Sequence, residues 1–163
     1  MSEIGIREAT IDDLDIIVDF SARLAAESEN IELDREVLSG GVSSALQDVS
    51  KARYFLAEVS DGEGPAEVAG QLMITYEWSD WRDGMFIWIQ SVYVRSECRR
   101  RGVFKALYNH VTVLASAEGY CGVRLYVHDG NVPARETYLR LGMVEPGYTV
   151  LETPDELKHE DDA

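Results

Sequence analysis

The fold is decided by residues 85–128, which read MFIWIQSVYVRSECRRRGVFKALYNHVTVLASAEGYCGVRLYVH. The apolar runs at its two ends, 85–94 and 123–128, have the β-branched and aromatic content typical of strands. The stretch between them, 102–118, carries apolar residues at helical spacing: Val103, Leu107, Val111 and Leu114. This order predicts a βαβ unit with two parallel strands and a right-handed crossover.

The link between the first strand and the helix concentrates positive charge. In a chain of net charge −15, five of the fifteen lysine and arginine residues fall within 95–105: Arg95, Arg99, Arg100, Arg101 and Lys105. Cations are disfavoured at a helix N-terminus, because the free amide groups and the macrodipole already make that end positive. A bound anion explains the cluster best, since amide and guanidinium groups both suit phosphate oxygens. A solvated basic turn is the alternative.

The remaining chain predicts a mixed α/β fold. Thr10 and Asp13 resemble a capping box that opens a helix, and polar or glycine-rich segments separate the later elements. The expected order is β-α-α-β-β-β-α-β-α-β, with strands at 4–9, 53–59, 67–78, 85–94, 123–128 and 144–151, and helices from 10 and at 34–47, 102–118 and 132–141. We expect one domain over 1–153 and a frayed acidic tail over 154–163.

Composition excludes several classes of protein. The chain is 45% hydrophobic and 28% charged, as soluble domains are, and no apolar run approaches the about 18 residues of a membrane span. The acidic balance argues against nucleic-acid binding, and the N-terminus lacks a signal-peptide pattern. Cys98 and Cys121 lack metal-site spacing and are expected to be free thiols. We therefore expect a cytoplasmic protein with no metal, no nucleic-acid partner and no membrane contact.

Two motifs lie within and just after the βαβ unit. The first is Arg99-x-x-Gly102-x-Phe104, and the second consists of Asn131, Ala134, Tyr138, Gly142 and Met143. At this spacing they resemble the phosphate loop Q/R-x-x-G-x-G/A and the signature N-x-x-A-x-x-x-Y-x-x-x-G-F of the GNAT superfamily of acyl-CoA-dependent N-acyltransferases. The resemblance covers 85–145 by motif and the rest by element order, so it implies a GNAT-like mixed sheet. Phe104 departs from the small residue of the family loop.

The resemblance also implies roles for individual residues, with acetyl-CoA as co-substrate and no metal. Backbone groups of Val92, Tyr93 and Val94 are expected to pair with the pantetheine arm. The pyrophosphate is expected at the loop and the helix start: Arg99, Arg100, Arg101, Gly102, Val103, Phe104 and Lys105. Asn131 is expected to bind the pantetheine, and Tyr138 to protonate the leaving thiolate. By position alone, Asn131 also suits a helix N-cap and Tyr138 a packed aromatic.

The motifs define the general base less well. Glu77, acting through a water, is the preferred expectation, and the alternatives lie on turns and strand ends: Glu27, Glu29, Glu32, Asp80, Asp83 and His128. The stretch 75–94 shows a second, weaker resemblance, to the diamine and thialysine acetyltransferases of the same superfamily. Those enzymes have acidic residues at the positions that Gln90 and Ser91 occupy here. Diamine specificity is therefore not carried over. Three tryptophans are candidates for an aromatic pocket that holds a cation: Trp78, Trp81 and Trp88.

The expected function is transfer of an acetyl group from acetyl-CoA to a small-molecule or peptide amine by direct attack. A regulatory module of the same fold, which binds acyl-CoA without turnover, is the first alternative. An unrelated nucleotide-binding domain is the second, although the chain has neither G-x-x-x-x-G-K-[ST] nor G-x-G-x-x-G. A homodimer is among the expected assemblies.

Overall fold

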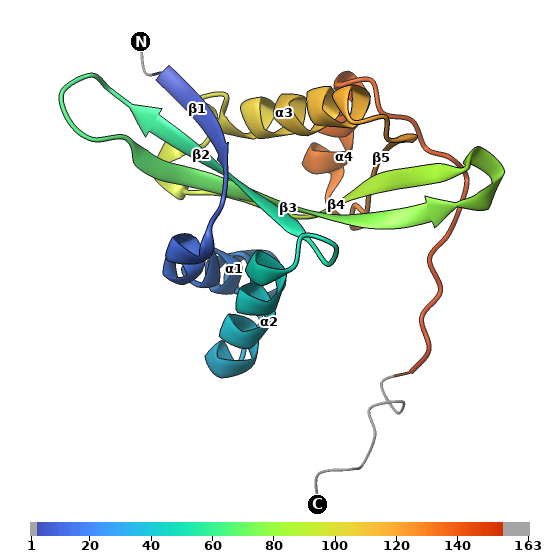
Figure 1. The fold of residues 1–163 in the computed structure, drawn as a ribbon, viewed down its shortest axis with the longest axis horizontal. Coiled ribbons are helices and arrows are strands. Elements are labelled where there is room, and N and C mark those ends of the chain that lie inside the picture. The colour runs from blue at the N-terminus through green and yellow to red at the C-terminus, as the bar shows by residue number, and fades with distance from the viewer. Residues whose placement is uncertain (1–2, 155–163) are drawn as a thin grey trace, which may run out of the picture. The chain divides into compact units, whose positions relative to one another are not determined.

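The computed structural model, which describes residues 3–154, places five strands in one mixed sheet (Figure 1). The strands are β1 (Glu3–Glu8), β2 (Arg53–Ser60), β3 (Glu67–Ser79), β4 (Gly84–Val94) and β5 (Gly122–Leu125). They are ordered β1-β2-β3-β4-β5 in space, and the pairs β1–β2, β2–β3 and β3–β4 are antiparallel. β4 and β5 are parallel. The mixed α/β class and the parallel βαβ pair are thereby confirmed.

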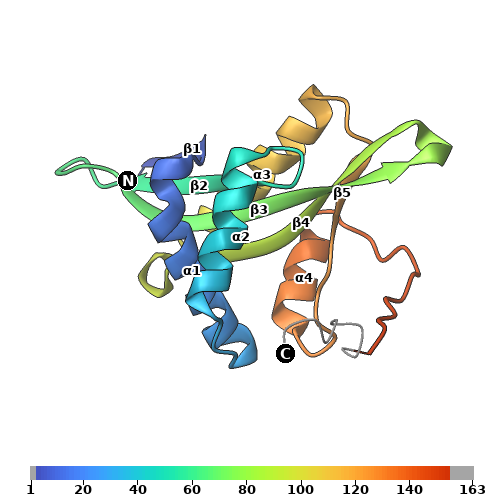
Figure 2. The same cartoon turned by 60° about the horizontal axis from the view of Figure 1, so that its bottom comes forward.

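Helices cover both faces of this sheet. α1 (Leu14–Glu29) and α2 (Arg35–Gln47) lie on one face and α3 (Val103–Ala117) on the other (Figures 1 and 2). Two adjacent residues of β3 contact helices on opposite faces. The side chain of Gln71 donates to Ser21 of α1 at 3.0 Å, whereas Gly70 lies against Val103 of α3. Neighbouring strand residues point to opposite faces, so odd-numbered residues of β3 from Gln71 onward point toward the α1 side.

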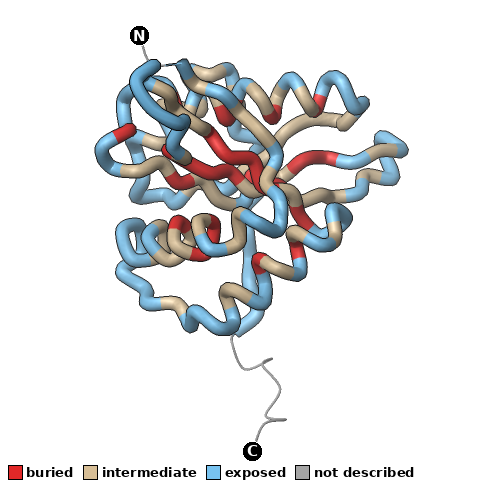
Figure 3. Tube along the Cα trace, turned by 60° about the vertical axis from the view of Figure 1, so that its left-hand side comes forward, coloured by how far each residue is buried: buried red, intermediate tan, exposed pale blue. Residues whose placement is uncertain are grey.

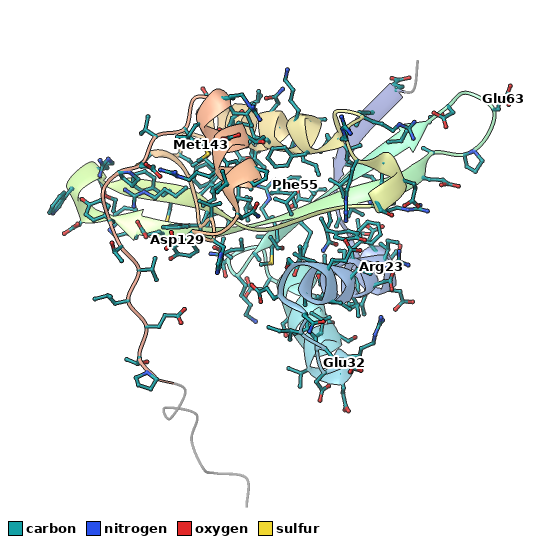
Figure 4. The ribbon with its side chains drawn as sticks, turned by 180° about the vertical axis from the view of Figure 1, so that it is seen from behind. Arg23, Glu32, Phe55, Glu63, Asp129 and Met143 are labelled. Carbon is teal, nitrogen blue, oxygen red and sulfur yellow. The ribbon has the colours of Figure 1, made fainter. Side chains whose placement is uncertain are left out.

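The sheet and the helices enclose a core layer on each face, and buried residues concentrate along the middle strands (Figure 3). Between the sheet and the pair α1–α2 the buried residues are Ile17, Val18, Val42, Ala45, Ala52, Tyr54 and Leu56. On the other face, the Phe55 ring lies 4.9 Å from the ring of His110 on α3 (Figure 4). Leu107 and Val111 are fully buried there, which confirms the helical spacing of these residues.

The predicted capping box precedes α1. It forms on the 3₁₀ turn Ile11–Asp13, where the Thr10 N–H donates to the Asp13 carboxylate at 2.8 Å. Two N–H groups of Arg7 donate to the same carboxylate, each at 2.8 Å. The Arg7 guanidinium, and then Thr10, lower the pKa of Asp13 from its ordinary value. One carboxylate therefore ties the end of β1 to the start of α1.

The strands expected in the C-terminal part differ from the structure. β5 ends at Leu125 and does not reach residue 128, and residues 144–151 form no strand. Pro146 has no N–H to donate to a ladder, and Gly147, with φ 81°, interrupts extended backbone. Only a short run remains after this break, and its Tyr148 and Leu151 side chains are exposed. The sixth strand was therefore a wrong prediction.

The chain divides after Tyr126 into two compact units, Met1–Tyr126 and Val127–Ala163. The first contains the sheet with α1 to α3, and the second contains α4 (Val132–Arg140). A single domain over 1–153 stays a prediction, and the predicted tail lies beyond the described residues except for Pro154. None of the helices in residues 3–154 has the length and apolarity to cross a membrane.

Asp13→Asn should lower the free energy of unfolding at pH 7 by about 1–2 kcal/mol, because Arg7 and Thr10 lose a charged acceptor. A depressed folded pKa contributes stability that is present above the unfolded value of about 4 and lost as pH falls through the folded value. Urea unfolding at stepwise lower pH should therefore show the wild type and the variant converging below about pH 4. Asp12→Asn, on the same turn, is the control and should change stability less. A difference that stays constant to low pH would contradict this account.

Candidate functional site

β4 and β5 separate partway along their length. They pair over four residues each, Phe86–Ile89 against Gly122–Leu125. β5 ends there, whereas β4 continues to Val94 with β3 on its other side. β5 thus supplies no partner to the backbone of Gln90–Val94, the segment that contains the predicted pantetheine-binding residues 92–94. A strand edge in this state can pair with an extended ligand as it would with another strand.

A β-bulge lies where the separation begins. Met73 of β3 is opposite Ser91, but the next residue, Ile74, is opposite Ile89, so Gln90 is an extra residue in β4. A bulge bends its strand and increases the local twist. The Gln90 side chain donates to the Thr75 hydroxyl at 2.8 Å. Gln90 gave no sequence signal for this role, because a bulge depends on the register of two strands.

The segment after β4 forms a loop that ends at the N-terminus of α3. A 3₁₀ turn covers Ser96–Cys98, and Arg100 (φ 64°) and Gly102 (φ 88°) lie in the left-handed region. Gly102, the N-cap residue of α3, has no side chain with which to cap the helix. The Phe104 ring lies 6.2 Å from that of Tyr108, one turn further on. Phe104 therefore places an aromatic ring beside Tyr108 at the position where the motif usually has a small residue.

Carboxylates hold several cations of this loop. Arg95 pairs with Glu67 at 3.5 Å, and Arg101 pairs with Asp61 at 3.3 Å, so both reach the β2–β3 hairpin. Arg100 and Lys105 are exposed. A cavity of about 280 Å³ lies between this loop and the β2–β3 hairpin, and Glu63 is at the tip of the hairpin (Figure 4). The cavity is lined by Val59, Asp61, Glu63, Gly64, Pro65, Glu67, Ala69, Arg95, Cys98 and Arg101.

Three predicted site residues meet at the end of β4. The Tyr93 hydroxyl donates to one oxygen of Glu27 at 2.9 Å, and the Arg99 guanidinium donates to the other. Arg99 Nε also donates to the Val94 carbonyl at 2.9 Å. Arg99 first, and then Tyr93, lower the pKa of Glu27, whereas burial and then Glu27 raise the pKa of Tyr93. These residues are 66 and 72 positions apart from Glu27, so only the fold brings them together.

The preferred base, Glu77, is held by two other strands. Its Oε1 accepts from Arg124 Nη1 at 2.5 Å, and its Oε2 accepts from Trp88 Nε1 at 3.1 Å. The guanidinium of Arg124 lies 3.8 Å from the centre of the Phe86 ring. Glu77 is odd-numbered, so this cluster lies on the α1 side of the sheet. The sequence analysis missed Arg124, whose signal was a single cation within an apolar strand.

The three tryptophans do not form one pocket. Trp88 reaches Glu77 on the α1 side of the sheet, whereas Trp78, the next residue of β3, points to the opposite side. Trp81 is 87% exposed at the β3–β4 turn. The structure therefore does not support an aromatic pocket built from all three.

Several alternative bases have local structural roles. The Asp80 carboxylate accepts from the Trp81 N–H at 2.9 Å in the turn, and Asp83 has φ 45° there. His128 Nδ1 accepts from the Gly130 N–H at 3.0 Å, in the turn that precedes α4. Glu32 is exposed in the α1–α2 connection, away from the sheet (Figure 4). Glu27, another alternative, contacts two predicted cofactor-binding residues, Tyr93 and Arg99.

The second motif forms one helix and its ends. Asn131 caps α4, its side-chain oxygen accepting from the Ala134 N–H at 3.3 Å, so the N-cap alternative is confirmed. The cap does not use the Nδ2 donors of Asn131, which suit a carbonyl ligand. Tyr138 is half-buried, and its carbonyl accepts from the Met143 N–H at 3.1 Å beyond Gly142 (φ 95°).

Both cysteines are free, Cys98 buried and Cys121 half-buried. In the part of the chain that the structure describes, no three His, Cys, Asp or Glu side chains are grouped to hold a metal ion. Within the first unit, the candidate site consists of the β4 edge, the arginines of the loop that follows it and the carboxylates that pair with them.

Gly102→Ala should lower the free energy of unfolding by about 1–2 kcal/mol, since a left-handed conformation is strained for any residue with a Cβ. An added Cβ would meet only Ile4, at 3.9 Å, so crowding is not the cause. Gly41→Ala is the matched control: Gly41 is exposed within α2 with open space around it, and alanine should stabilise by up to about 1 kcal/mol. Urea unfolding measures both. Equal stability of Gly102→Ala and the wild type would exclude the left-handed conformation.

Comparison with known proteins adds family evidence. The chain is similar to the crystal structure of a possible acetyltransferase from Clostridium difficile 630, with 46% identity, TM-score 0.84, and coverage of 92% of this chain and 96% of that one. Two more distant structures share the fold. One is an aminoglycoside N-acetyltransferase in complex with CoA (16% identity, TM-score 0.76, coverage 95% and 97%). The other is a ribosomal-protein-alanine N-acetyltransferase from Brucella melitensis biovar Abortus 2308 (15%, 0.71, 93% and 99%).

A search of curated proteins gave no match. The family model described as "Acetyltransferase (GNAT) family" matches residues 21–143, which is more than half of the chain. Together with the mixed sheet and the separation of β4 from β5 already described, this match shows that the chain belongs to the GNAT family of acetyltransferases.

Proposed function

We propose that this protein is an acetyl-CoA-dependent N-acetyltransferase that acts by direct attack of an amine on the thioester. Membership of the family supports acyl transfer from CoA in general. The observation that carries the finer proposal is the backbone edge Gln90–Val94, which β5 leaves unpaired and which leads through the arginine-rich loop to Gly102 at the N-terminus of α3. In acetyl-CoA, the extended pantetheine arm with its amide groups is followed by the pyrophosphate, so the molecule presents its groups in the same order as the β4 edge and the start of α3.

The cofactor contacts follow from that match. Backbone groups of Val92, Tyr93 and Val94 pair with the pantetheine arm, and an N–H of this segment polarises the thioester carbonyl. The amides of residues 102–105 bind the pyrophosphate, assisted by the guanidinium groups of residues 99–101. The Nδ2 of Asn131 donates to the pantetheine, while its oxygen remains in the helix cap.

The reaction needs two proton transfers. The neutral amine attacks the thioester carbon, and the C–S bond breaks as the carbonyl re-forms. Tyr138 donates its proton to the departing thiolate, and Glu77 receives the proton of the amine through a water. Both Glu77 oxygens already accept a hydrogen bond, but each has a second acceptor position for that water. No acyl-enzyme is required, and Cys98 is buried.

The acceptor is a small-molecule or peptide amine. The β3–β4 hairpin carries the carboxylates Glu77, Asp80 and Asp83, and the chain has a net charge of −15, so the local field attracts a cationic amine. The two distant structures have amine acceptors in their names, which agrees with this class. A cytoplasmic location and a homodimer remain predictions.

A second function is favoured by one observation. Glu77 is engaged by Arg124 and Trp88, as a carboxylate with a structural role would be. A module that binds acyl-CoA without turnover would keep the edge of β4 and the phosphate loop and would need no base. Binding and turnover must therefore be measured separately.

Combined reversal of Arg99 and Arg101 to glutamate should weaken acetyl-CoA binding by roughly tenfold or more, because charge-assisted contacts to the pyrophosphate are lost. Calorimetry with acetyl-CoA, ATP and NAD measures binding and selectivity. The control reverses Arg35 at the start of α2 and Lys51 after its end, and makes the same change of net charge. Both are exposed cations in ion pairs, Arg35 with Asp19 and Lys51 with Asp48. Equal affinity in the two double variants would contradict the phosphate-loop assignment, and preference for ATP or NAD would contradict acyl-CoA as the ligand.

Tyr138→Phe should lower turnover by about 10²–10⁴-fold with little change in acetyl-CoA affinity, because only the hydroxyl that protonates the thiolate is removed. Release of free CoA is followed over a panel of small amines and peptides with free amino groups. Tyr148→Phe, an exposed tyrosine in the same unit, is the control and should keep full turnover. Acetyl-CoA binding by the wild type with no release on any amine would favour the non-catalytic module. Near-normal turnover of Tyr138→Phe would return Tyr138 to a packing role.

A further inference from the structure

The carboxylate of Glu27 pairs with Arg99, the arginine that an anionic ligand would bind. Glu27 lies in the last turn of α1, and its Oε2 accepts from the guanidinium of Arg99 in the phosphate loop. Its other oxygen accepts from the Tyr93 hydroxyl at 2.9 Å, on the β4 edge. The Arg99 guanidinium also lies 5.7 Å from the centre of the Tyr93 ring. A single acidic side chain thus joins α1 to both parts of the candidate cofactor site.

Both partners of this ion pair stand at helix ends that disfavour their charge. Arg99 precedes the positive N-terminus of α3, and Glu27 lies near the negative C-terminus of α1, whose last turn contains no basic residue. Each charge compensates the other. Both side chains are nevertheless nearly half exposed, at 47% for Arg99 and 45% for Glu27. Exposed ion pairs are weak, so a stronger anion can displace Glu27.

We infer that Glu27 is an internal stand-in for the anionic ligand: it holds Arg99 in the free protein and yields that guanidinium when the pyrophosphate of acyl-CoA binds. This inference rests on the proposed function. Two of the five N–H groups of Arg99 are used, by Glu27 and by the Val94 carbonyl. A pyrophosphate that takes the guanidinium also repels a carboxylate at the same distance from it. Glu27 therefore lowers the affinity for the ligand, and its presence sets that affinity.

A purely orienting role of Glu27 predicts the opposite change in ligand affinity when Glu27 is removed. If Glu27 served only to orient Arg99 toward the ligand, its removal would loosen the arginine and weaken binding. If Glu27 competes with the ligand, its removal strengthens binding. The sign of one affinity change separates the two roles.

Glu27→Gln tests this directly, with coenzyme A as the probe and isothermal titration calorimetry as the measurement. Glutamine keeps the length and removes the charge, and Glu27→Gln should bind coenzyme A about two- to fivefold more tightly, as expected for release of an exposed ion pair. The matched control is Glu29→Gln, which removes an exposed charge two residues away on the same helix and should have a smaller effect. Thermal unfolding of both variants checks that the fold is intact.

A double-variant cycle identifies the partner. In an Arg99→Gln background, Glu27→Gln should change the affinity no more than Glu29→Gln does, since the arginine it competes for is absent. Weaker binding by Glu27→Gln, or an effect equal to that of Glu29→Gln, would overturn the inference while the proposed function stands. If the wild type and Glu27→Gln both fail to bind coenzyme A, the proposed function is wrong and the inference falls with it.

Discussion

The candidate site depends on a parallel pairing that stops after four residues. α3 returns the chain so that β5 lies beside β4, and β5 then ends at Leu125 while β4 continues to Val94. Had the two strands paired along their full length, every backbone group of Gln90–Val94 would be satisfied inside the sheet. Because they separate, β4 has an unpaired backbone edge on its β5 side, although it is not the last strand of the sheet. The extra residue at Gln90 bends β4 at the point where this edge begins.

Charge compensation is the second organising feature of the first unit. The net charge is −15, yet the arginines around the site are held by particular carboxylates: Arg99 by Glu27, Arg101 by Asp61 and Arg124 by Glu77. Each pair joins elements far apart in the sequence. The pairs are partly exposed, so they contribute little stability individually. Their consequence is positional, since they set the direction of each guanidinium.

Several motif residues have structural reasons that coexist with the proposed chemistry. Asn131 caps α4 with its oxygen, and Gly102 and Gly142 hold left-handed backbone at the start of α3 and the end of α4. A helix cap uses one side of an amide and leaves the other available, so the two kinds of role do not compete. This explains why spacing alone cannot separate a helix boundary from a ligand contact in such a motif.

The sequence by itself determined the order of the strands and helices through α4 and the parallel βαβ unit among them. Those features rest on local periodicity and on capping residues such as Thr10 and Asp13. The tertiary structure decided where β5 ends, that Gln90 is a bulge and that residues 144–151 form no strand. It also decided the partners Glu27–Arg99 and Glu77–Arg124. These outcomes depend on strand register and on contacts between residues tens of positions apart, and neither has a local pattern in the chain.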